Sequence, residues 1–262
     1  MMTSRQLREA FHFCFLERLL RIADARLFVL KGGVNLRFFF HSPRYSEDMD
    51  LDVLAGAVPT LRKNGYKILD DAAFRRTLRT FGITDLEIND PVRAKHTQTT
   101  QRFRVRLVTT AGERLPSKVE FSRRAAGREQ ISDHMQSTAV DRIDTEIARR
   151  YNRLSFRCQH YTAEAAIVQK VLALAGRPAT QARDVFDLDV LQRGGYAQAR
   201  QLQRSIGQHE LALASQNLES LSFDDFSGQV LEFLDEDDRQ EYASAEAWRS
   251  MKEQVENLLR AP

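Results

Sequence analysis

Three aspartates at alternate positions, Asp48, Asp50 and Asp52, are the residues of this chain best suited to chemistry. The residue that follows each of them is apolar: Met49, Leu51 and Val53. Side chains of a β-strand point alternately to its two faces, so residues 46–53 (SEDMDLDV) are predicted to form a strand with one acidic face. Like charges on one face repel unless cations neutralise them, and carboxylate oxygens suit Mg²⁺ or Mn²⁺. We therefore predict a divalent-cation site; the alternative is an exposed edge strand whose acids provide solubility.

A glycine pair precedes this acidic strand. Lys31, Gly32 and Gly33 follow the short apolar run LFVL at 27–30 and lead into an apolar helical stretch. Glycines allow a phosphate to approach the backbone, and the N-terminus of the next helix offers unpaired N–H groups and a positive dipole end. The segment is thus a candidate phosphate-binding turn, although a glycine pair alone is also typical of ordinary turns.

Three further segments carry charged residues near apolar ones. In KVEF (118–121), Lys118 and Glu120 share one face of a predicted strand, and Glu120 is the candidate third carboxylate. Lys170 lies near the apolar stripe of a predicted helix, where an unpaired ammonium would be costly, so we predict a buried anion or carboxylate partner. Asp184 and Asp187 are three residues apart and share a helix face; the alternative for this pair is an Asp at the start of the helix plus a surface salt bridge.

Hydrophobic periodicity predicts the elements that position these residues. Before residue 125 we expect helices over 3–24, 34–41 and 70–81 and a loop over 54–66. We expect strands over 27–30, 46–53, 83–89, 101–109 and 118–121. Only helices are expected from Thr162 onward, over 163–176, 183–191, 197–206, 210–220, 223–234 and 241–260. This pattern predicts an α/β domain over 1–125, a basic connection over 126–160 and a helical domain over 161–262.

Length and composition exclude several classes of protein. The chain has 262 residues, of which 42% are hydrophobic, enough for a sizeable core. No apolar run approaches the roughly 18–20 residues of a membrane helix, and no secretory signal is visible. The two cysteines, Cys14 and Cys158, do not indicate a disulfide framework. We expect a reduced, cytoplasmic protein that is not bound to a membrane.

The net charge of +3 conceals an uneven distribution. Residues 91–160 contain 15 Lys or Arg and 7 Asp or Glu, whereas residues 201–262 contain 5 and 13. Arginine binds phosphates through planar, bidentate contacts, so the basic block is a candidate nucleic-acid surface. The alternative is an ordinary solvated face.

These motifs together resemble a known family. K-G-G-x-x-L-R, R-x-S-x-D-x-D-L-D, K-V-E, an alanine-rich helix with a lysine, and R-D-x-x-D-L occur in the order typical of the AbiEii-type nucleotidyltransferases, which are toxins of type IV toxin–antitoxin and abortive phage infection systems. The resemblance covers residues from about 28 to 191, and no motif is matched beyond 195. It implies a nucleotidyltransferase fold of the polymerase-β kind, an α/β (α+β) fold with a small mixed sheet and helices, plus a helical C-terminal domain.

The resemblance also implies roles for individual residues. Asp48, Asp50 and Glu120 would bind the metal ions, and Lys170 and Asp184 would complete the catalytic set. The nucleotide would be bound by Lys31, Gly32, Gly33, Ser46, Lys118, Lys170 and Arg183. Asp52 could replace Asp50 as a ligand if the strand is bulged. Val34 and Asn35 depart from the small residues usual after the glycine pair.

The activity implied is metal-dependent transfer of a nucleotide from an NTP to an RNA acceptor such as tRNA, with Mg²⁺ or Mn²⁺ as cofactor and a cognate antitoxin as partner. Alternative acceptors are a small molecule such as an aminoglycoside, or a protein side chain. A phosphohydrolase with an Asp nucleophile would need an apolar strand before the first Asp, but PRYSE precedes Asp48. A non-catalytic binding protein of the same fold is less consistent with a chain that has every acidic and lysine position of the motifs.

Overall fold

The computed structural model describes residues 2–90, 97–123, 137–196 and 199–260. The chain divides into two compact units. The first comprises 1–39, 45–129 and 139–160, and the second comprises 40–44, 130–138 and 161–262. Within the described residues, no helix has both the length and the hydropathy needed to cross a bilayer.

A seven-stranded mixed sheet forms the centre of the first unit, with the strand order β3-β4-β5-β2-β1-β7-β6. Its strands are β1 (Phe28–Lys31), β2 (Asp48–Val53), β3 (Ile83–Ile88), β4 (Thr100–Thr109), β5 (Arg114–Arg123), β6 (Thr138–Arg142) and β7 (Arg157–Tyr161). β2 runs parallel to β5 and antiparallel to β1, while β4 is antiparallel to both β3 and β5. The strands predicted from alternation are therefore present, and β5 extends beyond the four residues expected.

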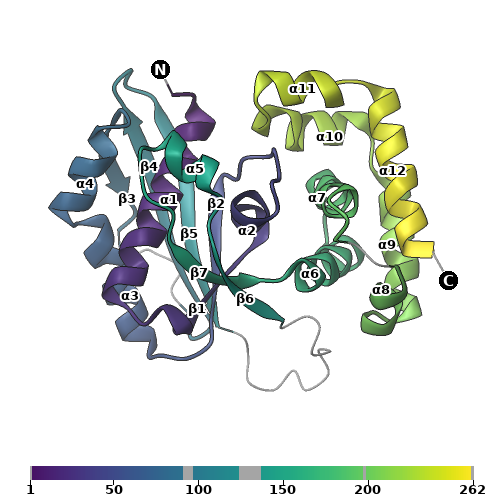
Figure 1. Ribbon diagram of the computed structural model, residues 1–262, viewed down its shortest axis with the longest axis horizontal. Coiled ribbons are helices and arrows are strands. Elements are labelled where there is room, and N and C mark those ends of the chain that lie inside the picture. The colour runs from purple at the N-terminus through teal and green to yellow at the C-terminus, as the bar shows by residue number, and fades with distance from the viewer. Residues whose placement is uncertain (1, 91–96, 124–136, 197–198, 261–262) are drawn as a thin grey trace. The chain divides into compact units, whose positions relative to one another are not determined.

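Helices cover the apolar face of this sheet. The first unit contains α1 (Ser4–Ile22), η1 (Ala25–Leu27), α2 (Gly32–Phe39), α3 (Val58–Leu69), α4 (Ala72–Arg79) and α5 (Thr145–Arg150). α1, α3 and α4 lie side by side and contact β5, β4 and β3 respectively (Figure 1). A capping box at Thr3 begins α1, and the Asp71 side chain caps α4 by accepting from the Phe74 N–H.

The prediction of a loop over 54–66 was wrong, because α3 occupies most of it. Leu61, Ile68 and Leu69 recur at helical spacing and are buried, and a proline lies in the first turn, where its missing N–H costs nothing. Gly65 has a packing function in this helix. A Cβ at this position would lie 2.3 Å from Cζ of the buried Phe103 ring.

The segment expected as a basic connection over 126–160 contributes regular structure from residue 138 onward. It contains β6, α5 and β7, and the last of these pairs in parallel with β1. Residues 124–136 lie outside the described part. The polar, arginine-rich composition obscured the short strands, because β6 is largely exposed and lacks a clear apolar face.

The second unit is helical, as predicted. Thr162 caps the first helix by accepting from the Ala165 N–H, and this helix ends at Gly176. Its helices are α6 (Ala163–Gly176), α7 (Ala182–Arg193), α8 (Ala199–Ser205), α9 (Gln208–Ser220), α10 (Phe223–Gln229), η3 (Leu231–Phe233), α11 (Glu236–Tyr242) and α12 (Ala245–Arg260). Aromatic contacts of Phe186 with Tyr242, and of Phe226 with Trp248, join α7 and α10 to the last two helices.

We predict that Gly65→Ala lowers the free energy of unfolding by about 1–3 kcal/mol, the usual cost of overpacking a core. Helix propensity alone predicts the opposite sign, a gain of about 1 kcal/mol. Urea denaturation would measure the change. Gly228→Ala in α10 is the control, because a Cβ there has no neighbour within 4 Å. Equal effects of the two substitutions would contradict this account of the Phe103 contact.

Candidate active site

Charged side chains from four adjacent strands form a row on one face of the sheet. Lys31 on β1 pairs in register with Asp50 on β2, Asp50 with Glu120 on β5, and Glu120 with Arg102 on β4. Residues in register on neighbouring strands point to the same face. Two positions along β2, Asp48 is in register with Lys118. The structure thus brings together Lys31, Asp48, Asp50, Lys118 and Glu120, all predicted from the sequence.

Basic side chains hold most of these carboxylates. Lys118 Nζ lies 3.1 Å from Asp48 Oδ2 and 3.7 Å from Glu120 Oε2. Arg102 Nε donates to Glu120 Oε2 at 2.6 Å. Among the described residues, Asp50 makes no hydrogen bond or ion pair. A half-buried carboxylate without a partner beside two other acids is a ready position for a cation.

The pKa values of the two central carboxyl groups, Asp50 and Glu120, shift in opposite directions. Burial, with smaller contributions from Glu120 and Asp48, raises the pKa of Asp50 despite the nearby charges of Lys118 and Lys31. Burial also acts to raise the pKa of Glu120, but the hydrogen bond from Arg102 and the charge of Lys118 outweigh it, so that pKa is lowered. Glu120 is therefore ionised at neutral pH. Burial destabilises the ionised form of Asp50, so a positive charge beside it would be stabilising.

Asp52 differs from Asp50 in its surroundings. The strand is regular at this point, since the register of β2 with β1 and β5 is continuous from Asp48 to Val53. Asp52 is buried and accepts from Lys31 Nζ at 2.5 Å. The oxygen-rich set of Asp48, Asp50 and Glu120 fits Mg²⁺ or Mn²⁺ better, because Asp50 is unpaired. In the described part of the chain, no three acidic, His or Cys side chains already enclose a metal position, and Lys118 contacts both Asp48 and Glu120.

The glycine turn adjoins this acidic row. Gly32 has a φ of +69°, a conformation that favours glycine, and a Cβ there would lie 3.5 Å from Asp50 Oδ2. Gly33 follows it in the first turn of α2. Ser46 Oγ donates to the carbonyl oxygen of Asp48 at 2.8 Å, which fixes the start of the acidic strand. The backbone therefore approaches the carboxylates closely where the sequence predicted a phosphate-binding turn.

The second unit contains a separate network of buried charges. Lys170 Nζ contacts Asp184 Oδ1 at 2.8 Å and also Asp187 Oδ2. Arg44 Nη2 donates to both oxygens of Asp187 at 3.0 Å, and Arg177 lies 3.2 Å from Asp184. Both aspartate side chains are fully buried, so the prediction of a buried carboxylate partner for Lys170 is confirmed. The alternative of a surface salt bridge for Asp184 and Asp187 is excluded.

Charge pairing dominates the acidity of Asp187. Burial acts to raise its pKa, but Arg44 and Lys170 outweigh burial, and the pKa lies below its usual range. Arg44, Arg177 and Arg102 were not predicted from the sequence as partners of the motif carboxylates. The spacing of Asp184 and Asp187 was the available signal, since two acids on one buried helix face require counter-ions. Arg183 makes no hydrogen bond or ion pair within the described residues.

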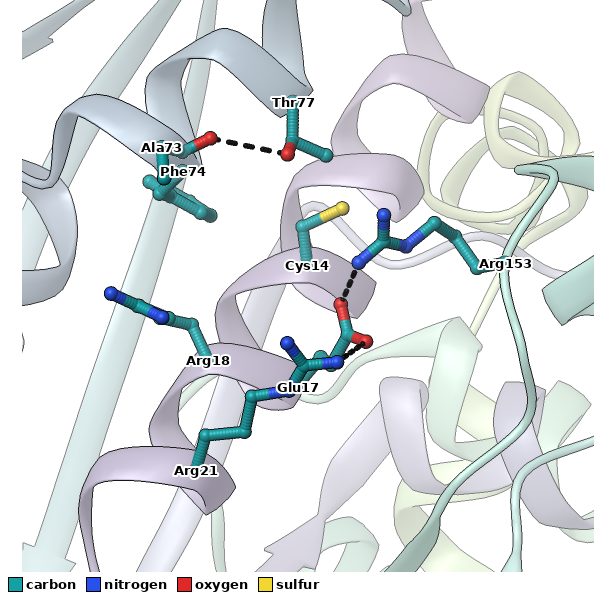
Figure 2. A pocket seen from close by; sticks show the side chains of 8 residues that line it. All are labelled: Cys14, Glu17, Arg18, Arg21, Ala73, Phe74, Thr77 and Arg153. Carbon is teal, nitrogen blue, oxygen red and sulfur yellow. Dashed lines mark hydrogen bonds and ion pairs between the residues drawn. The ribbon is translucent and has the colours of Figure 1, made fainter.

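A small cavity of about 90 Å³ lies apart from the acidic row, beside α1 and α4 (Figure 2). Three arginines line it, and each is paired with a carboxylate: Arg18 with Asp71, and Arg21 and Arg153 with Glu17. Burial raises the pKa of the Cys14 thiol to about 12, so this thiol stays protonated. The cavity therefore offers no activated nucleophile.

Solved structures share the fold of this chain. The chain is similar to MenT4, the nucleotidyltransferase toxin Rv2826c of Mycobacterium tuberculosis H37Rv, with a TM-score of 0.62 and 14% identity over 99% of this chain and 85% of that one. It is also similar to JHP933 of Helicobacter pylori, with a TM-score of 0.52 and 19% identity over 99% and 94% of the two chains. The predicted fold class, a small mixed sheet with helices and a helical C-terminal part, is confirmed. No curated protein sequence matches the chain.

The family follows from the sequence match. Residues 14–261 match the family described as nucleotidyl transferase AbiEii toxin, type IV TA system. The chain belongs to this family, which confirms the resemblance drawn from the motifs.

We predict that Asp50→Asn raises the free energy of unfolding at pH 7 in the absence of divalent cations. The raised pKa means that the ionised carboxyl is less stable in the folded than in the unfolded chain. The gain should be largest above the folded pKa and vanish below the ordinary value of about 3.9, where both states are protonated. Urea denaturation at several pH values would measure it, with the exposed Glu146→Gln as control. Destabilisation at pH 7 would contradict this explanation.

Removal of Asp187 should have the opposite effect. Asp187→Asn leaves Arg44 and Lys170 buried with less countercharge, and breaking such a pair costs roughly 3–5 kcal/mol. The loss should be complete above the ordinary carboxyl pKa and shrink as the pH falls through the lowered folded pKa. Chemical denaturation as a function of pH would test this. Glu241→Gln, 61% exposed, should change stability by less than about 1 kcal/mol, and a similar effect of both would contradict the network's importance.

Proposed function

We propose that this chain transfers a nucleotidyl group from an NTP to an RNA acceptor such as tRNA, in the cytoplasm, and that a cognate antitoxin counteracts it. Membership in the AbiEii family supports the nucleotidyltransferase and toxin classes. The observation that carries the proposal is the unpaired Asp50 carboxylate, set between Asp48 and Glu120 and beside the Gly32 turn.

The carboxylate row is suited to binding Mg²⁺ or Mn²⁺. Asp48, Asp50 and Glu120 would be the ligands, and Lys118 would leave its present contacts with Asp48 and Glu120 as the cation replaces its charge. Bound divalent cations would stabilise the charge that develops on the attacking and leaving oxygens of the transfer. We assign Asp52 a structural role instead, because Lys31 already neutralises it.

The reaction joins an acceptor hydroxyl oxygen to the α-phosphorus and breaks the bond between the α-phosphorus and the leaving pyrophosphate, while the hydroxyl proton is released to water. The lowered pKa of Glu120 makes it a weak base, and its hydrogen bond with Arg102 holds it in place. We therefore favour Glu120 as a metal ligand rather than as the group that removes this proton. Gly32 and Gly33 would admit a phosphate to the backbone, with Ser46 next to them in the binding turn.

Lys170 and Arg183 are the candidate contacts for the triphosphate in the second unit. An ammonium has three donors, and Asp184 and Asp187 accept two from Lys170, which leaves one for an anion. Asp184 is fully buried, so we propose that it orients Lys170 rather than contacting substrate. Arg183 has no partner in the described residues and sits in the first turn of α7.

The decisive experiment incubates the purified chain with each labelled NTP, Mg²⁺ and total cellular RNA, and identifies the species that gains label. Asp48→Ala and Lys170→Ala should each reduce transfer at least about 100-fold, because electrostatic stabilisation of this kind typically contributes that much. Circular dichroism would verify that both variants fold. Glu146→Ala and Lys67→Ala, which are exposed, are the matched controls.

Normal transfer by either folded variant would refute the assigned site. Label appearing on protein or on a small molecule, rather than on RNA, would refute the acceptor. Toxicity on expression, relieved by the same substitutions, would test the biological role separately.

A further inference from the structure

Three arginines alternate along β4 on the face opposite to the core. Arg102, Arg104 and Arg106 point to one side, while Phe103 and Val105 are buried on the other. Arg102 belongs to the acidic row through Glu120, whereas Arg104 and Arg106 are exposed. We call Arg102, Arg104 and Arg106 the β4 arginine track.

The track and the end of the acidic site formed by Asp48 and Lys118 line one groove. Its volume is about 610 Å³, and its lining includes Asp48, Lys118 and all three arginines of the track. The register explains this continuity, because Arg102 lies level with Glu120, Arg104 with Lys118 and Arg106 with Pro116. The track therefore starts beside the carboxylates and leads away from them along the sheet.

Each acid that lines the groove lies near at least one cation. Asp48 lies 3.1 Å from Lys118. Glu87 lies 2.7 Å from Arg114 and 3.7 Å from Arg106, and Glu47 lies 3.8 Å from Arg8. Arg104 has no side-chain hydrogen bond or ion pair within the described residues. The groove thus has an unused guanidinium, and the exposed Arg106 has only a long contact, so both can bind an anion.

Strand order separates this anion site from the glycine turn. The turn lies at β1, the carboxylates on β2 and β5, and the track on β4. In-line displacement requires the attacking hydroxyl and the leaving pyrophosphate on opposite sides of the phosphorus. If the turn at β1 binds the NTP, the acceptor must approach from the other side of the carboxylates. The track on β4 lies on that side.

We propose that Arg104 and Arg106 of the β4 arginine track bind the phosphodiester backbone of a single-stranded RNA acceptor end. This inference rests on the proposed function, whose acceptor class it makes specific. On a strand, the Cα atoms of arginines two residues apart are separated by about 6.6–6.8 Å. That spacing is too wide for phosphorus atoms joined through one bridging oxygen, as in a triphosphate, and suits phosphates separated by a sugar. Guanidinium groups bind carboxylates as well as phosphates. An acidic peptide is therefore the competing ligand in the test.

The test compares the full-length double variant Arg104→Gln/Arg106→Gln with a charge-matched control, Arg26→Gln/Arg149→Gln, whose arginines are 88% and 73% exposed elsewhere in the same unit. Fluorescence anisotropy with a labelled single-stranded RNA would give Kd over a range of salt concentrations. We expect the double variant to have a roughly tenfold higher Kd at low salt. The slope of log K against log salt concentration should fall in magnitude by about 1.4, as for two lost single-strand phosphate contacts. The control should match the unmodified chain.

Transfer kinetics separate this inference from the proposed function. The double variant should raise KM for the RNA acceptor, with KM for the NTP and kcat at saturating RNA unchanged. If the unmodified chain transfers nucleotide to RNA and the double variant has the same KM for RNA, the assignment of the track is refuted. The proposed function is then unaffected. A rise in KM for the NTP, or tighter binding of an acidic peptide than of RNA, would overturn the assignment of the track as well. Absence of transfer to any RNA by the unmodified chain would refute the proposed function itself.

Discussion

The parallel pairing of β2 with β5 is the constraint on which both the core and the candidate site depend. One register places Met49 beside Val119 on the apolar face and Asp50 beside Glu120 on the other. Because side chains alternate with a period of two, a slip of one residue would move the acids into the core and the apolar residues into solvent. The burial of the apolar face therefore fixes the spacing of the carboxylates, and the site inherits its geometry from the core.

Clustered charge is costly, and the chain limits this cost differently in its two units. In the first unit, basic groups hold the outer acids and leave Asp50 unpaired, which preserves a position of unbalanced negative charge. In the second unit, Asp184 and Asp187 are fully buried and balanced by three cations. A buried network of this kind stabilises only when complete, so its value lies in holding Lys170 in one orientation.

Sequence patterns predicted what depends on periodicity and on residue type. The acidic strand, the glycine turn, the cap at Thr162 and the buried partner of Lys170 all follow from local spacing and the cost of unpaired charge. Helix α3 did not follow, because Gly65 resembles a loop residue until its contact with Phe103, which is distant in sequence, is known. Arg44 was missed for the same reason: its partner Asp187 lies 143 residues away, and no local pattern encodes that distance.

The distribution of lysine and arginine adds a functional distinction to this arrangement. Only 7 of the 39 cations are lysines, yet Lys31, Lys118 and Lys170 each contact a carboxylate of the motifs. A lysine ammonium is a mobile point charge, whereas the arginine fork holds a carboxylate in fixed geometry. Arg44 and Arg102 therefore set positions, while Lys118 can exchange its carboxylates for a bound cation or phosphate. The choice of cation at each position separates the groups that must stay in place from those that must release their partner when substrate arrives.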